Sequence, residues 1–262
     1  MDFQSISRRF ALTFFSISMA ALGQQQAQAQ SMYGPGGLFL NPTADFPKQG
    51  QVTPAVLVMP QRLDNGNRLT WSSYSVDYGL TDKWELGATY LKINPGSSEF
   101  KDASGGLYAK YKVLEEVPQK RPALAVGGNF LSGGDANART AFAALRFTPT
   151  RAGAKRPVGL HLGAIYIDQL EGIKHRELSP FAGIDYTISS RLSAFAEVRS
   201  ALEPESGGTN GTFASRSLGV VWKPVNNFKL VLAYGSNGWN DKSSQLGFGI
   251  GYALRGGRTR GK

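Results

Sequence analysis

The sequence predicts an all-β protein, an antiparallel transmembrane up-and-down β-barrel of about 12 strands. Three observations carry this prediction. Apolar and polar side chains alternate along segments of about ten residues, and long polar joints alternate with short ones, as in outer-membrane barrels. Beyond the N-terminus no apolar run approaches the ~20 residues that a membrane helix needs. Strands that face lipid must close into a barrel, because lipid offers their backbone no hydrogen bonds.

The stretch from Trp71 to Ile93 shows the pattern most clearly. Two alternating strands flank a tight turn at residues 81–83. The apolar parity comprises Tyr74, Val76, Tyr78 and Leu80 before the turn, and Trp84, Leu86, Ala88 and Tyr90 after it. This is the hairpin that a transmembrane barrel requires.

Residues 1–29 are predicted to be a signal peptide. Arg8 and Arg9 precede an apolar core over residues 10–23, and Ala27-Gln28-Ala29 offers a small-x-small cleavage site. The two arginines also resemble a twin-arginine signal, but that route carries folded cargo. A barrel must cross the inner membrane unfolded, so we favour the general secretory route, with the outer membrane of a Gram-negative-type bacterium as destination.

Composition narrows the function classes. Removing residues 1–29 takes away two Arg and one Asp and leaves a net charge of +9. Such a surplus suits nucleic acid, an anionic membrane or anionic cargo, and secretion excludes nucleic acid. The chain has no cysteine, hence neither a disulfide framework nor a lipoprotein anchor.

Residues 30–49 precede any clear strand and are rich in Gly and Pro. They are expected to form a flexible leader, a lumenal plug or a first irregular strand. The barrel is expected over residues 50–254, and residues 255–262 form a basic periplasmic tail. The predicted strands are 51–61, 69–80, 84–93, 106–114, 122–131, 140–148, 158–167, 178–188, 192–201, 213–222, 228–235 and 245–254.

Alternation also assigns the two faces of the sheet. The parity of Leu107, Leu162 and Phe248 should meet lipid, whereas segments 51–61 and 213–222 have no clear register. The aromatic girdle is predicted to contain Trp84, Trp222 and Tyr252 at the periplasmic rim and Tyr90, Tyr166 and Trp239 at the outer rim.

The opposite parity collects charged residues that should line the lumen: Asp77, Glu85, Lys110, Lys112, Arg146, Asp185, Glu197, Arg199 and Lys229. Such charges either pair across strands and close the barrel, or line water and select solutes by charge. Lumenal glycines such as Gly183 and Gly247 leave volume for water or relieve curvature. We expect a passive or gated path for small solutes, and a closed structural or scaffolding barrel is the alternative.

Catalysis, a metal site and a cofactor are not expected. A lipid hydrolase at the barrel rim is a less favoured alternative, because His161 is predicted inside a strand and His175 in a charged loop, and neither lies in a nucleophile motif. No motif suggests a metal.

The expected partners are outer-membrane lipid and the outer-membrane assembly machinery. The basic tail, with Lys120, Arg121, Arg151, Lys155 and Arg156, places positive charge on the predicted periplasmic side. This charge could recruit anionic polysaccharide or periplasmic export components to the inner mouth.

Two passages resemble known families. Tyr78 to Gly87, YGLTDKWELG, resembles the strand-turn-strand hairpin of porin-like barrels. Gly37 to Asp45, GLFLNPTAD, is similar to the motif that opens barrels of the exopolysaccharide-biosynthesis outer-membrane family. The second resemblance implies a role in the export or assembly of surface polysaccharide.

Overall fold

The computed structural model describes residues 37–62, 68–95, 103–133, 137–169, 175–200, 214–236 and 245–255. Within these ranges the regular structure consists of strands, and no helix there is long and apolar enough to cross a membrane. The predicted signal peptide, Trp239 and residues 256–262 of the predicted basic tail lie outside the described residues.

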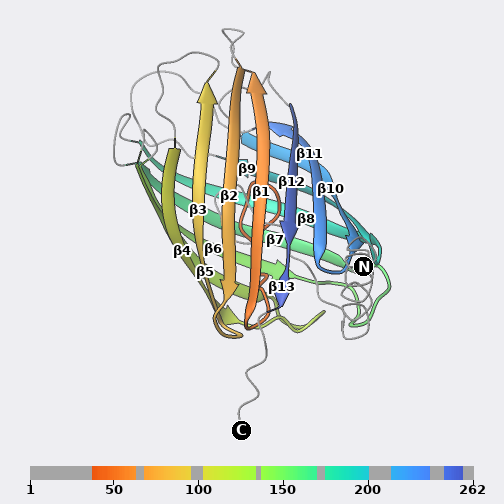
Figure 1. Cartoon of the computed structure of the whole chain (residues 1–262). Helices are drawn as coiled ribbons and strands as arrows, with labels where there is room; N and C mark the ends of the chain where they lie inside the picture. The colour runs from red at the N-terminus through yellow and green to blue at the C-terminus, as the bar shows by residue number, and fades with distance from the viewer. Residues whose placement is uncertain are drawn as a thin grey trace, which may run out of the picture.

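The strands follow the alternating segments of the sequence (Figure 1). They are β1 (Gln51–Arg62), β2 (Arg68–Gly79), β3 (Trp84–Pro95), β4 (Ala103–Leu114), β5 (Ala123–Ser132), β6 (Ala138–Phe147), β7 (Val158–Gln169), β8 (His175–Ser189), β9 (Leu192–Ser200), β10 (Ala214–Val225), β11 (Phe228–Ser236), β12 (Gln245–Tyr252) and β13 (Leu254–Arg255). Their bounds agree with the predicted segments to within a few residues, because period two is strong in nearly all of them.

The sheet closes on itself, which confirms the predicted fold class. Each strand from β1 to β12 pairs antiparallel with the next, and β12 pairs with β1 from Ala55↔Gly251 to Val58↔Phe248. The short β13 continues the line of β12 beyond Ala253 and pairs with the start of β1. The barrel therefore has twelve strand positions, and the predicted final strand is interrupted at Ala253.

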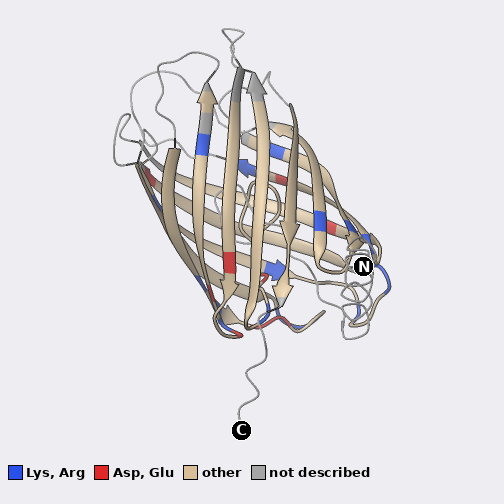
Figure 2. Ribbon diagram, in the orientation of Figure 1, with Lys and Arg blue, Asp and Glu red and all other residues tan. Residues whose placement is uncertain are grey.

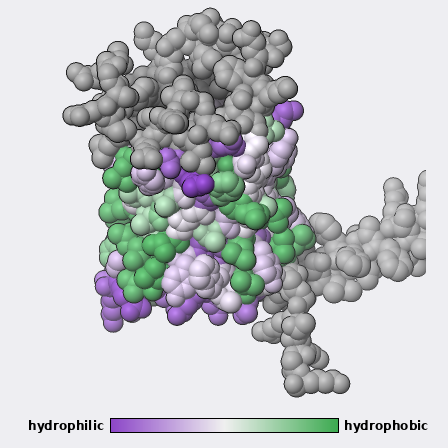
Figure 3. Space-filling model, turned by 90° about the vertical axis from the view of Figure 1, so that its left-hand side faces the viewer, coloured by the Kyte–Doolittle hydropathy of each residue, from purple (hydrophilic) through white to green (hydrophobic). Residues whose placement is uncertain are grey.

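The outer surface carries an apolar belt between more hydrophilic ends (Figure 3). Leu107, Leu162 and Leu218 are 71%, 56% and 61% exposed, values that would be costly in water for such large apolar groups. The assigned lipid-facing parity points outward in the described strands, and Trp84, Tyr90, Tyr166, Trp222 and Tyr252 of the predicted girdle are exposed. A lipid environment accounts for this surface.

The structure shows which side chains face inward in the two strands, β1 and β10, whose register was not clear from the sequence. Leu57 and Met59 of β1 are buried inside the barrel, and Pro54 and Pro60 take the outward parity. In β10, Val221 is buried and Leu218 faces outward. Apolar residues occur on both parities here because the inner ones pack against a segment that enters the lumen.

Several lumenal glycines leave room for a large side chain on the neighbouring strand. In four pairs of facing residues a Cβ on the glycine would collide with the aromatic ring opposite. The pairs are Gly87↔Tyr108, Gly127↔Phe142, Gly163↔Phe181 and Gly219↔Phe195. This arrangement is the aromatic rescue of a glycine in a sheet. These positions therefore add less free volume to the lumen than the sequence suggested.

Replacing Gly163 with Val is expected to destabilise the barrel by about 1–3 kcal/mol, the usual cost of overpacking. The new side chain would collide with the Phe181 ring and with the backbone oxygen of Ala143. Urea unfolding in lipid vesicles measures the effect. Gly105→Val is the matched control, because a Cβ at Gly105 meets no atom within 4 Å. Equal losses in both variants would contradict the steric explanation.

Candidate functional site: the lumen and its inserted segment

Residues 37–47, here called the lumenal segment, lie inside the barrel. The exposed residues 48 and 49 connect the segment to the start of β1 at the lower end of the barrel in Figure 1. Gly37 forms an isolated bridge with Pro42, and the Leu38 amide donates to the Asn41 carbonyl at 3.0 Å, so residues 37–42 make a tight turn. A Cβ on Gly37 would strike the Asn41 carbonyl, so glycine is required there. The turn projects its apolar tip into the lumen.

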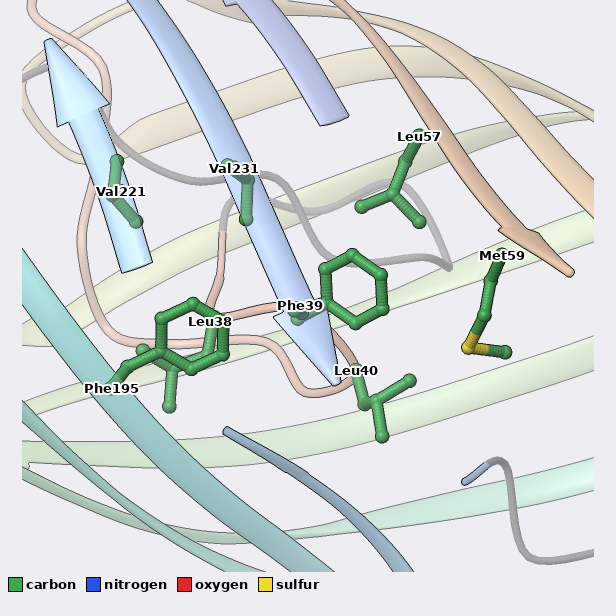
Figure 4. Close-up of a cluster of buried hydrophobic side chains, with 9 residues drawn as sticks. Leu38, Phe39, Leu40, Leu57, Met59, Phe195, Val221 and Val231 are labelled. Atoms are coloured by element: carbon green, nitrogen blue, oxygen red, sulfur yellow. The ribbon is translucent and has the colours of Figure 1, made fainter. Parts of the chain in front are cut away.

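The tip is held by an apolar cluster (Figure 4). Leu38, Phe39 and Leu40 are at most 8% exposed. Their partners come from β1, β9, β10 and β11, namely Leu57, Met59, Phe195, Val221, Val231 and Ala233. Gly183 and Gly247 leave room for Leu38 and Phe39, because a Cβ at Gly183 would lie 2.5 Å from Leu38 and a Cβ at Gly247 would lie 2.6 Å from Phe39. Burial of these side chains fixes the depth of the segment.

The carboxylate of Glu197 on β9 fastens the turn. It accepts hydrogen bonds from the backbone amides of Phe39 at 3.0 Å, Leu40 at 2.7 Å and Asn41 at 3.1 Å. The Asn41 side-chain amide adds a bond at 2.8 Å, and the Ser217 hydroxyl adds one at 2.6 Å. Successive backbone amides around an anion form a nest, and bonds to a charged acceptor are the strong ones. We call this arrangement the Glu197 latch.

A second anchor lies nearer the short turns of the barrel. Lys110 Nζ forms a fully buried ion pair with Glu85 at 2.7 Å and donates to the Asp45 carbonyl at 2.5 Å. Lys110 and Lys112 also lie over the Phe46 ring, at 4.5 Å and 5.1 Å from its centroid. Cations held against an aromatic face and a carboxylate tie the lumenal segment to β3 and β4.

Arg146 on β6 completes the second anchor. Its side chain lies 3.3 Å from the Asp45 carboxylate and 2.6 Å from that of Glu116. Burial alone would raise the pKa of Asp45, but the charge of Arg146 and a hydrogen bond from the Thr43 hydroxyl hold that pKa below its usual value. Asp45 therefore stays ionised at neutral pH, and the ion pair with Arg146 persists.

The remaining predicted lumenal residues also point inward. Asp77, Arg199 and Lys229 are buried, and Arg199 donates to Ser215 at 3.3 Å. Lys229 Nζ makes no hydrogen bond within the described ranges. Alternation alone placed these side chains on the inner parity, but it carried no information on their partners.

His161 is 1% exposed and lies 2.6 Å from the Asp185 carboxylate across β7 and β8. The described contacts of this pair include no serine, threonine or cysteine nucleophile, and the pair lies inside the lumen. His175 begins β8 and pairs in register with Gln169. In the described part of the chain no cluster of three or more His, Asp and Glu residues could hold a metal ion.

One side of the lumen is polar. Ser73, Ser75, Thr89, Tyr108 and Asn129, on β2 to β5, are buried on the inner parity. Within the described residues the hydroxyls of Ser73, Thr89 and Tyr108 have no hydrogen-bond partner. Buried polar groups normally have a hydrogen-bond partner, so water or a solute is expected to bind these hydroxyls. We call this surface the hydroxyl wall.

Several of these features were missed from the sequence. Asn41, Asp45, Glu116 and Ser217 were not among the predicted lumenal residues, because they lie on turns or carry no charge. The excess of apolar residues on both parities of β10 was the signal that something apolar occupies the lumen beside it.

Comparisons with known proteins agree with the fold. No family model and no curated protein matches the sequence. Among solved structures, the chain resembles KdgM porin with 12% identity and a TM-score of 0.53, over 78% of this chain and 99% of that one. A second KdgM porin structure, in complex with disordered oligogalacturonate, matches with the same values. An outer membrane channel from Pseudomonas putida F1 matches with 12% identity and a TM-score of 0.52, over 80% and 96% of the two chains.

At such identities the likeness shows a shared fold. The class of protein is a closed twelve-stranded antiparallel β-barrel of the kind found in outer-membrane channels.

Proposed function

We propose that the protein is an outer-membrane barrel that provides a gated path for small solutes, with the lumenal segment as the gate. The observation that carries the proposal is the hydroxyl wall, whose buried hydroxyls of Ser73, Thr89 and Tyr108 lack protein partners and face the lumen. These hydroxyls have almost no accessible surface while the lumenal segment is docked, so the path opens beside them when the segment moves and water or a solute then supplies their hydrogen bonds.

The apolar belt supports a position in the outer membrane, and the solved structures that share the fold are outer-membrane channels. A role in surface-polysaccharide export is a finer version of the same proposal, supported by the GLFLNPTAD motif that forms the tip of the lumenal segment. Neither version needs a catalytic group.

Conductance in planar bilayers tests the path. Folded, inserted protein should carry ionic current in small steps, because the lumenal segment narrows the lumen. The absence of current from folded barrels would favour the second candidate, a closed structural barrel. The observation that favours this candidate is the pairing of lumenal charges, since Glu85 with Lys110 and Arg146 with Asp45 fill part of the interior.

Replacing Lys112 with Glu should shift the reversal potential in a salt gradient toward cation preference. Lys112 is partly exposed on the inner parity near the lower mouth, where a reversed charge acts on passing ions. Lys83→Glu is the matched control, because Lys83 is exposed on the neighbouring turn outside the lumen. Equal shifts in the two variants would mean that Lys112 does not line the path.

A further inference from the structure

Two turns at the lower end of the barrel form a basic surface. We call residues 115–122, between β4 and β5, and residues 148–157, between β6 and β7, the basic lobe. Its exposed cations are Lys120, Arg121, Arg151, Lys155 and Arg156. Of its two acids, Glu115 is exposed, and Glu116 is engaged by Arg146. Figure 2 shows Lys and Arg on the turns at this end of the barrel.

The basic lobe is a folded structure. The Val117 amide donates to the Arg121 carbonyl at 2.9 Å, which closes the first turn, and the Gln119 amide donates to the Thr148 carbonyl at 2.9 Å, which joins the two turns. The second turn is closed by a bond from the Ala154 amide to the Arg151 carbonyl at 3.0 Å. The cations are therefore presented from a fixed backbone.

Lys112 extends the positive charge of the lobe to the lower mouth of the lumen. It is partly exposed on the inner face of β4, the strand that leads into the first turn, whereas Arg146 is paired with Glu116 at 2.6 Å and with Asp45 at 3.3 Å. Exposed like charges on one surface repel one another unless an anion lies among them. A cationic surface that leads into a mouth also raises the local concentration of anions there.

We propose that the basic lobe docks an extended polyanion, a chain of repeated carboxylate or phosphate groups, and feeds it to the lower mouth of the lumen. The proposal rests on the proposed path and names the chemical class that the path would take. A chain fits better than a folded acidic protein, because the cations are spread over two turns and continue inward to Lys112. Lipid headgroups of the surrounding membrane are the other source of anions for this surface.

Binding of fluorescent polyacrylate to the folded barrel tests the docking step without any need for conductance. In neutral-lipid nanodiscs we expect binding that weakens steeply with salt, and no binding of neutral dextran. The variant Arg151→Gln/Lys155→Gln/Arg156→Gln should bind at least about tenfold more weakly at low salt, since each exposed charge pair contributes up to a factor of about five.

The matched control is Lys48→Gln/Lys83→Gln/Arg191→Gln, which removes the same charge from exposed positions at the same end outside the lobe. It should retain most of the affinity. Equal losses in the two triple variants would overturn the lobe as a docking site. Loss of polyacrylate binding when anionic phosphatidylglycerol is added to the nanodiscs would also overturn it, because lipid headgroups would then occupy the lobe.

Current recordings separate this proposal from the proposed function. Polyacrylate added on the lobe side should block the current, and the same addition on the opposite side should not. Block from both sides alike would contradict docking at the lobe while leaving the path intact. If polyacrylate binds through the lobe to a barrel that carries no current, the proposed path is wrong and the proposed docking site still stands.

Discussion

Replacing Glu197 with Ala is expected to release the tip of the lumenal segment and to raise the single-channel conductance several-fold. The variant removes an acceptor that holds the amides of Phe39, Leu40 and Asn41. Bonds to a charged group each contribute about 1.5–3 kcal/mol, so without them only the apolar contacts hold the tip, and the tip should leave its site for part of the time. Single-channel recording in planar bilayers measures the change.

Cysteine labelling gives an independent readout, because the chain contains no cysteine. Leu40→Cys should resist a water-soluble maleimide in the presence of Glu197 and react quickly when Glu197→Ala is added. Glu115→Ala is the charge control, since Glu115 is exposed on a turn outside the lumen. Unchanged conductance together with rapid labelling would show that the segment moves without limiting the path.

Replacing Glu85 with Ala is expected to destabilise the barrel by about 3–5 kcal/mol, the cost of leaving one member of a buried ion pair uncompensated. Lys110 would keep its contacts with the Asp45 carbonyl and the Phe46 ring but would lose the Glu85 carboxylate that lies 2.7 Å from its Nζ. Urea unfolding of the protein in lipid vesicles measures the loss.

The double variant Glu85→Ala/Lys110→Ala should lose less than the two single variants summed, because removing Lys110 also removes the stranded charge. Additive losses would mean that Glu85 and Lys110 do not stabilise each other.

The strands and the two faces of the sheet could be predicted from the sequence. In β2 and β3 the side chains strictly alternate, so the outward position of Tyr74 and the inward position of Glu85 follow from period two. Prediction was weakest at β1 and β10, where Leu57 and Val221 are apolar on the inner parity. Such residues cannot be assigned to lipid or lumen until the packing partner is known.

The role of the Gly-rich and Pro-rich segment before β1 could not be predicted. Its short apolar run Leu38-Phe39-Leu40 suits a leader, a plug or an irregular strand equally well. Its place depends on Glu197, more than 150 residues away in the chain. Local patterns carry no information about such distant contacts.

The sequence by itself determined the closed barrel, its approximate strand bounds and the charged inner parity, because lipid on one side and unsatisfied backbone groups leave a single solution for alternating strands. Only the tertiary structure decided which charges meet and where the lumenal segment docks. Closure of the sheet brings Glu197 to the turn at residues 38–41 and Lys110 to Asp45. Partners of this kind are set by the curvature and register of the whole barrel, which no short stretch of sequence encodes.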